Sequence, residues 1–176
     1  MKKKIPNVFL VGPSGAGKST VGQELANMLK IDFYDSDRVI EERAGVSISW
    51  IFDVEGEEGF RKRETKVLQD LTELSNIVMA TGGGAILQPE NRLLLSARGF
   101  VVYLKATIEQ QLERIHRKDH RPLLQVVNVE ETLYAMKEER QPLYEEIADI
   151  SFDTDSQSVK IVVKEIYEYL ITHGKF

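Results

Sequence analysis

The sequence predicts an α/β fold in which a five-stranded parallel sheet is flanked by helices on both faces. Short segments rich in apolar and β-branched residues alternate with longer segments whose apolar residues recur every three or four positions. The first short segment is apolar at consecutive positions, which is typical of a strand buried on both faces. Strands separated by helices require crossover connections, and right-handed crossovers make the strands parallel.

The pattern places each element along the chain. Strands are expected at residues 5–11, 33–37, 76–81, 100–105 and 150–154. Helices are expected at 17–30, 37–54, 57–74, 89–97, 107–116, 130–141 and 159–170. Thr107 is the expected cap of its helix, and Pro142 is expected to end or kink the helix before it.

Length and composition limit the classes of protein that the chain can belong to. At 176 residues and 42% hydrophobic content, it can close one core, so residues 1–176 are predicted to form a single domain. The absence of cysteine excludes disulfides and thiolate metal sites and favours a cytoplasmic location. The apolar run at 8–11 is far too short for a signal peptide or membrane span. A net charge of −5 argues against nucleic-acid binding, so small molecules are the expected partners. The protein is further expected to be a monomer.

A phosphate-binding motif follows the first predicted strand directly. Residues 12–19 read G-P-S-G-A-G-K-S, which fits G-x-x-x-x-G-K-[ST], and a helix follows, as the motif requires. The loop amides and the helix N-terminus would bind phosphate oxygens, Lys18 would bridge the β and γ phosphates, and Ser19 would ligate Mg²⁺. A glycine-rich turn that happens to contain a lysine is the alternative interpretation, which both flanking elements disfavour. The candidate nucleotide-binding residues here are Gly12, Ser14, Gly15, Ala16, Gly17, Lys18, Ser19 and Thr20.

Two carboxylates lie at the end of the second predicted strand. Asp35 and Asp37 are two residues apart, and in a strand such residues face the same side. One could hold Mg²⁺ through water while the other accepts a proton from an acceptor hydroxyl. The alternative is a solvated N-cap pair before the helix at Arg38.

Two further motifs suggest a site for a small anion. Arg61 and Glu64 are three positions apart on a predicted helix, and an arginine held by a carboxylate is a preorganised fork for an anionic substrate. A surface ion pair would give the same pattern. The triple glycine at 82–84 would let the backbone approach a substrate closely, although a plain turn also fits it.

The second half of the chain contributes two arginines. Arg121 closes a basic loop, and phosphoryl transfer commonly recruits an arginine that arrives when a loop shuts. Arg140 lies near the end of a predicted helix, just before Pro142.

Taken together, these motifs resemble the shikimate kinases, and the likeness extends from Gly12 to the loop after Thr154. That family has a P-loop, D-x-D after the second strand, F-R-x-x-E, a triple glycine after the third strand, R-P-L-L in a lid, and R-x-P-L-Y. This chain shows the five motifs after the P-loop in the same order, at 35–37, 60–64, 82–84, 121–124 and 140–144.

The resemblance implies a P-loop kinase fold with a mobile lid at about 112–124 and a substrate-binding insertion at about 34–63. It implies transfer of the γ-phosphoryl group of ATP to the 3-hydroxyl of shikimate, giving shikimate 3-phosphate and ADP. This reaction belongs to aromatic amino acid biosynthesis. The implied cofactor is Mg²⁺, and the implied partners are ATP and shikimate.

The resemblance also implies a role for each residue. Shikimate would be bound by Asp37, Phe52, Phe60, Arg61, Gly82, Gly83, Gly84 and Arg140. The catalytic residues would be Lys18, Asp37 and Arg121, and Ser19 and Asp35 would hold the metal. Arg114 and Arg121 would contact the nucleotide, as would Gln157, although the loop 155–157 lacks a proline found in some members.

Two other functions fit parts of the pattern. Another P-loop small-molecule kinase, such as a gluconate or nucleoside monophosphate kinase, shares the phosphate loop, but two arginines aimed at one carboxylate argue against a neutral polyol. A GTP-binding switch would require a guanine-reading N-K-x-D motif, which the sequence lacks.

Overall fold

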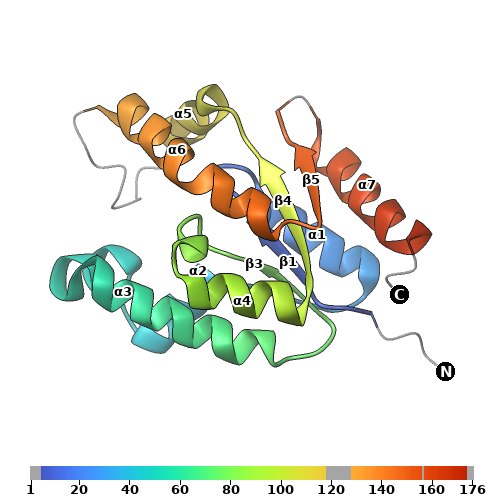
Figure 1. Cartoon of the computed structure of the whole chain (residues 1–176), viewed down its shortest axis with the longest axis horizontal. Coiled ribbons are helices and arrows are strands. Elements are labelled where there is room, and N and C mark those ends of the chain that lie inside the picture. The colour runs from blue at the N-terminus through green and yellow to red at the C-terminus, as the bar shows by residue number, and fades with distance from the viewer. Residues whose placement is uncertain (1–4, 118–127, 156, 174–176) are drawn as a thin grey trace.

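The protein is built around one parallel sheet, as the sequence predicts (Figure 1). The computed structural model describes residues 5–117, 128–155 and 157–173. The strand order is β2-β3-β1-β4-β5, and every neighbouring pair is parallel. The strands are β1 (Val8–Val11), β2 (Asp32–Asp35), β3 (Ile77–Ala80), β4 (Phe100–Lys105) and β5 (Ile150–Asp153).

Helices connect all of these strands. They are α1 (Lys18–Leu29), α2 (Ser36–Ala44), α3 (Ile48–Thr72), the short 3-10 helix η1 (Ala85–Leu87), α4 (Pro89–Arg98), α5 (Ile108–Arg117), α6 (Val129–Ile147) and α7 (Val159–Thr172). Within the described ranges, no helix combines the length and the apolar character needed to cross a membrane.

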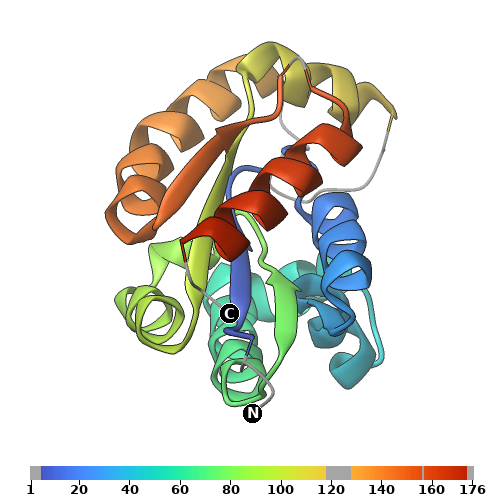
Figure 2. The same cartoon turned by 90° about the vertical axis from the view of Figure 1, so that its right-hand side faces the viewer.

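The helices form two layers because consecutive strand residues face opposite sides of the sheet. One set of strand residues packs against α3, α4 and α6, and the alternate set packs against α1 and α7. In β1, for example, Phe9 and Val11 face the first layer, whereas Val8 and Leu10 face the second. Figure 2 shows α7, in red, lying across the second face.

The region predicted as one helix at 37–54 is in fact two helices. Gly45, with φ of 71°, ends α2, and the Ser47 side chain accepts a hydrogen bond from the Trp50 amide to start α3. Glycine is favoured after a helix and serine before one, so both signals are present in the sequence. Helix α3 then runs to Thr72 through a kink at Gly56.

Pro142 was expected to end or kink α6, and it does not end it, because the helix continues to Ile147 with Pro142 inside it. Proline removes one backbone donor, which leaves a carbonyl of the preceding turn without its helical bond. Pro142 is exposed, so water can satisfy that carbonyl. Beyond it, Tyr144 and Ile147 are buried in the core and anchor the last turns.

The topology brings the predicted motifs to the carboxyl edge of the sheet. β1 lies beside β3, so the loop after β1 adjoins the triple glycine after β3, and β2 on the other side of β3 ends at Asp35. Hydrogen bonds tie these ends together: Thr81 donates to the Leu10 carbonyl, and the Gly82 amide donates to Ser36 Oγ. Ligands of open α/β sheets bind at this edge.

The core packing of α3 gives a direct test of the fold. Leu68 is fully buried against the sheet, so we expect Leu68→Ala to lower the free energy of unfolding by about 2–5 kcal/mol. Leu93 on α4 is 71% exposed and serves as the matched control, with an expected change within about 0.5 kcal/mol. Urea unfolding followed by circular dichroism measures both, and equal losses would contradict the burial described here.

Candidate active site

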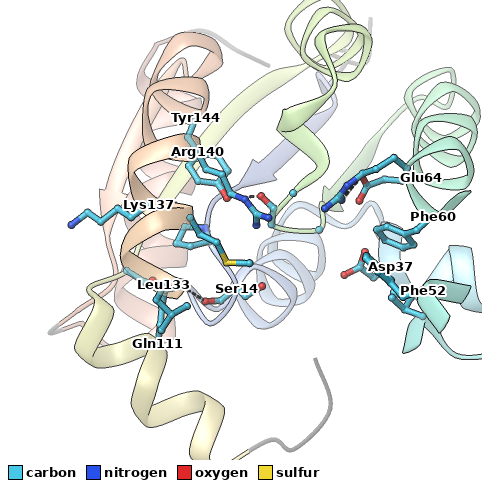
Figure 3. A pocket seen from close by; sticks show the side chains of 18 of the residues that line it. Ser14, Asp37, Phe52, Phe60, Glu64, Gln111, Leu133, Lys137, Arg140 and Tyr144 are labelled. Atoms are coloured by element: carbon cyan, nitrogen blue, oxygen red, sulfur yellow. Dashed lines mark hydrogen bonds and ion pairs between the residues drawn. The ribbon is translucent and has the colours of Figure 1, made fainter. Parts of the chain in front are cut away.

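A cavity of about 630 Å³ opens at the carboxyl edge of the sheet (Figure 3). All residues that the sequence assigned to the substrate line it, namely Asp37, Phe52, Phe60, Arg61, Gly82, Gly83, Gly84 and Arg140. Ser14 of the phosphate loop lines it as well. In Figure 3, Asp37, Phe52, Phe60 and Glu64 lie on one side of the cavity, opposite Arg140, Tyr144 and Leu133.

The phosphate loop runs from Gly12 into the first turn of α1. Gly17 is the N-cap of α1 and makes no side-chain capping bond. The cap residue therefore does not accept hydrogen bonds from the amides of the first turn. Lys18 is buried, and its ammonium group donates to the carbonyls of Gly12 at 2.7 Å and Pro13 at 2.8 Å. The lysine thus lies against the same loop whose amides can bind an anion.

Ser19 and Asp35 join the phosphate loop to the end of β2. The Ser19 hydroxyl donates to Asp35 Oδ2. A hydroxyl and a carboxylate in contact are the oxygen donors that Mg²⁺ prefers, so this pair fits that ion. In the described part of the chain, no group of three or more His, Cys, Asp or Glu side chains is placed to hold a metal ion.

The prediction that Asp35 and Asp37 face one side of a strand is wrong in its geometry. Asp35 is the last residue of β2 and the N-cap of α2, and its Oδ1 accepts bonds from the amides of Asp37 and Arg38. Asp37 already belongs to the first turn of α2. The capping interpretation therefore describes Asp35, while Asp37 lines the cavity.

Arg61 is held by two glutamates inside the wall of the cavity. Its Nη1 donates to Glu64 Oε1 at 2.9 Å and its Nη2 to Glu57 Oε1 at 3.3 Å. The Glu64 side chain is completely buried, and that of Arg61 is 8% exposed. The pair is therefore no ordinary surface ion pair: it is a desolvated one, in which each charge depends on the other.

The triple glycine makes room for these charged groups. A Cβ on Gly84 would lie 2.3 Å from Arg61 Nη2, and one on Gly82 would lie 2.6 Å from Asp37 Oδ1. The sequence predicted a close approach at this loop, and side chains of the protein make that approach. A larger residue at either position would displace a group of the site.

Helix α6 supplies the opposite wall. Arg140 is buried, and its Nε has no hydrogen-bond partner among the described residues. One turn later, the Tyr144 hydroxyl donates to the Gly83 carbonyl. Burial raises the pKa of Tyr144, which keeps its hydroxyl protonated as the donor.

Glu64 has an unusual proton affinity. Burial raises its pKa from 4.5 to about 7, the Arg61 charge opposes this shift, and the nearby Asp37 charge adds to it. Its second oxygen, Oε2, has no hydrogen-bond partner among the described residues. Near neutral pH, this carboxyl group can therefore gain or lose a proton.

The predicted nucleotide-binding residues are only partly brought together. Arg114 on α5 lies over the phosphate loop, with its Nη1 3.6 Å from where a Cβ of Gly17 would be. Thr20 is exposed in the first turn of α1, and Gln157 is exposed between β5 and α7, outside the cavity lining. Arg121 lies outside the described residues, and so do residues 118–124 of the expected lid, whose first part forms the end of α5.

The cavity also contains residues that no motif indicated, among them Gln111, Leu133 and Met136. Glu64, which belongs to the F-R-x-x-E motif, was considered only as a partner of Arg61. The helical periodicity of 130–141 places Leu133, Met136 and Arg140 on one face, so this signal was present in the sequence. Gln111 had no comparable signal.

A phosphate loop with its adjoining hydroxyl–carboxylate pair, next to a cavity lined by two buried arginines, defines a P-loop phosphotransferase for a small anionic acceptor. Comparison with known proteins gives the family. The shikimate kinase family model matches residues 14–171. A shikimate kinase of Legionella pneumophila (strain Corby) is 58% identical over 167 residues, which cover 95% of each chain. One from Vibrio parahaemolyticus is 60% identical over 164 residues, or 93% of this chain and 95% of that protein.

Solved structures agree. The shikimate kinase of Acinetobacter baumannii, determined in complex with shikimate, superposes with a TM-score of 0.95 at 47% identity. The match covers 97% of this chain and 96% of that one. The chain belongs to the shikimate kinase family, and it is an ATP-dependent phosphotransferase of that family.

The raised pKa of Glu64 predicts a specific pH dependence of stability. The folded protein holds this proton more tightly than the unfolded chain, so unfolding releases it between pH 4.5 and about 7. The free energy of unfolding should therefore fall by up to about 3 kcal/mol as pH rises through this interval, with no further contribution from Glu64 above it.

Glu64→Gln removes that proton, so the difference in stability between wild type and variant should change across this pH range. Urea unfolding at a series of pH values from about 4.5 to about 8 measures it. Glu58→Gln, at a side chain that is 85% exposed, is the control. Parallel pH profiles for Glu64→Gln and wild type would contradict the assignment.

Proposed function

We propose that this chain transfers the γ-phosphoryl group of ATP to the 3-hydroxyl of shikimate, giving shikimate 3-phosphate and ADP in aromatic amino acid biosynthesis. One observation carries the proposal: Arg61, Arg140 and Asp37 line the same cavity as Ser14 of the phosphate loop. That arrangement suits an acceptor with a carboxylate at one end and a hydroxyl at the other. We further propose that the enzyme is a cytoplasmic monomer.

Shikimate would bind through its carboxylate and its ring. Arg61 and Arg140 are both buried, and forked guanidinium groups bind a carboxylate strongly when water is excluded. The rings of Phe52 and Phe60, with centroids 4.8 Å apart, offer an apolar surface for the cyclohexene ring. Asp37 would accept a hydrogen bond from the acceptor hydroxyl and is the candidate base.

Catalysis would come from positioning and charge neutralisation. The amides at the start of α1 would bind the phosphates, and Lys18 would turn from the loop carbonyls to the transferring phosphoryl group. Ser19 and Asp35 would hold Mg²⁺, which when bound neutralises charge on phosphate oxygens. The half-enclosed cavity would limit competition from water as an acceptor.

The choice of acceptor is the direct test. A coupled assay of ADP release is expected to show turnover with shikimate and none with gluconate or nucleoside monophosphates. Lys18→Ala is expected to abolish that turnover, because it removes the ammonium group that would neutralise charge on the transferring phosphoryl group. Turnover with gluconate or a nucleoside monophosphate in place of shikimate would overturn the proposal.

The two arginines give a second test. Arg61→Ala or Arg140→Ala should weaken shikimate binding by about 2–5 kcal/mol, because each leaves a desolvated carboxylate with half of its clamp. ADP affinity should change little in either variant. Calorimetric titration measures both ligands, and Arg43→Ala, at an exposed arginine paired with Asp70, is the control. Wild-type shikimate affinity in both variants would remove the substrate assignment.

A further inference from the structure

A glutamine outside every motif connects α5 to the phosphate loop. Gln111 is 5% exposed, lines the cavity, and donates from Nε2 to the Ser14 carbonyl at 2.9 Å. The two residues are 97 positions apart in the chain. Burying a polar amide is costly unless it makes such bonds, so a glutamine at this place has a definite partner.

The carbonyl that Gln111 binds belongs to the central peptide of a tight turn. The Ala16 amide donates to the Pro13 carbonyl at 3.2 Å, which closes a four-residue turn with Ser14 and Gly15 at its centre. Gly15 has φ of 86°, the value of the third residue of a type II turn. Type I and type II turns differ mainly in the direction of this central peptide.

The direction of the peptide decides which group faces a bound phosphate. In a planar trans peptide, the carbonyl of Ser14 and the amide of Gly15 point in opposite directions. A bond that holds the carbonyl towards α5 therefore holds the amide away from α5. In the reversed orientation, a partly negative oxygen would point where the amide now points, and it would repel an anion.

We propose that Gln111 is a positioning residue that fixes the Ser14–Gly15 peptide with the Gly15 amide directed at the nucleotide phosphates. The inference rests on the proposed function, since it assigns phosphates to this loop. Gln111 itself touches neither phosphate nor transferring group in this assignment. It acts on binding only through the orientation of one peptide.

Helix α5 is well placed to give that support. Its Ile108 packs with Leu133 of α6 in a small apolar cluster, which fixes the helix on the opposite wall of the cavity. Arg114, one turn after Gln111, lies against Gly15 and Gly17. The neighbouring Gln110 points elsewhere and donates to the Thr154 carbonyl at 2.8 Å, at the end of β5. The chain therefore contains a matched control on the same helix.

The experiment compares Gln111→Met with Gln110→Met. Each variant keeps the side-chain length and removes the amide group. Gln111→Met loses the bond to the Ser14 carbonyl, and Gln110→Met loses the bonds to the Thr154 carbonyl and the Thr107 amide. Calorimetry with MgADP and with magnesium tripolyphosphate, which has phosphates but no adenosine, measures the phosphate contribution separately. Gln111→Met is expected to lower the affinity for both ligands about tenfold, the usual effect of one lost hydrogen bond. Gln110→Met is expected to retain the wild-type affinity for tripolyphosphate.

Gly15→Ala tests the same peptide without changing Gln111. A Cβ at this position would meet nothing closer than 3.6 Å, so the substitution acts through the positive φ alone. Gly15→Ala should lower the affinity for tripolyphosphate as Gln111→Met does. In the double variant, the loss of binding free energy should be smaller than the sum of the two single losses, because both substitutions act on one peptide.

Three results would overturn the inference: wild-type tripolyphosphate affinity in Gln111→Met, wild-type affinity in Gly15→Ala, or additive losses in the double variant. A different result would contradict the proposed function: wild-type protein that binds neither ligand, or that does not phosphorylate shikimate. If the wild type is active and Gln111→Met binds tripolyphosphate equally well, the positioning role alone is lost.

Discussion

The buried pair of Arg61 and Glu64 is the interaction on which the rest of the site depends. Neither charge is stable alone in that place, because removing one partner leaves the other desolvated. The pair explains why the loop after β3 has a glycine at position 84, since a side chain there would occupy the position of the guanidinium group. It also explains the pKa of Glu64. Burial raises this pKa, and the positive charge of Arg61 lowers it by less than burial raises it. In the proposed function, a substrate carboxylate bound beside Arg61 would add another negative charge and would favour the protonated form of Glu64.

The cavity lies between α2 and α3 on one side and α5 and α6 on the other. Asp37 and Arg61 come from α2 and α3, whereas Gln111 and Leu133 come from α5 and α6, whose facing residues Ile108 and Leu133 share a small cluster, while the end of α6 packs on the same core as α3. The wall formed by α5 and α6 holds both backbone loops of the cavity through side-chain donors. Gln111 binds the phosphate loop at Ser14, and Tyr144 binds the triple glycine at Gly83. The shape of both loops therefore depends on how α5 and α6 are seated.

The sequence predicted what depends on local patterns. The strands, the phosphate loop and the face of α6 that includes Arg140 all follow from spacing along a short segment. The predictions from sequence were wrong where contacts with distant parts of the chain determine the local structure. Asp35 and Asp37 look like two residues of one strand, but the strand ends between them, because Asp35 caps α2. Pro142 looks like a helix end, but buried residues beyond it keep the helix intact. Gln111 could not be found, since a glutamine on a helix has no distinctive neighbours until the fold supplies Ser14.

The strand order determines why these scattered residues meet at all. Because β1 lies between β3 and β4, the phosphate loop is flanked on one side by the triple glycine and on the other by the chain that leads into α5. A Cβ on Gly83 would lie 3.2 Å from both the amide and the hydroxyl of Ser14, so the two loops are in direct contact. Periodicity reveals that strands exist and does not reveal which strands are neighbours. Had β4 paired with β3 instead, Arg61 and the phosphate loop would be separated by a strand, and the same motifs in the same order would form no common cavity.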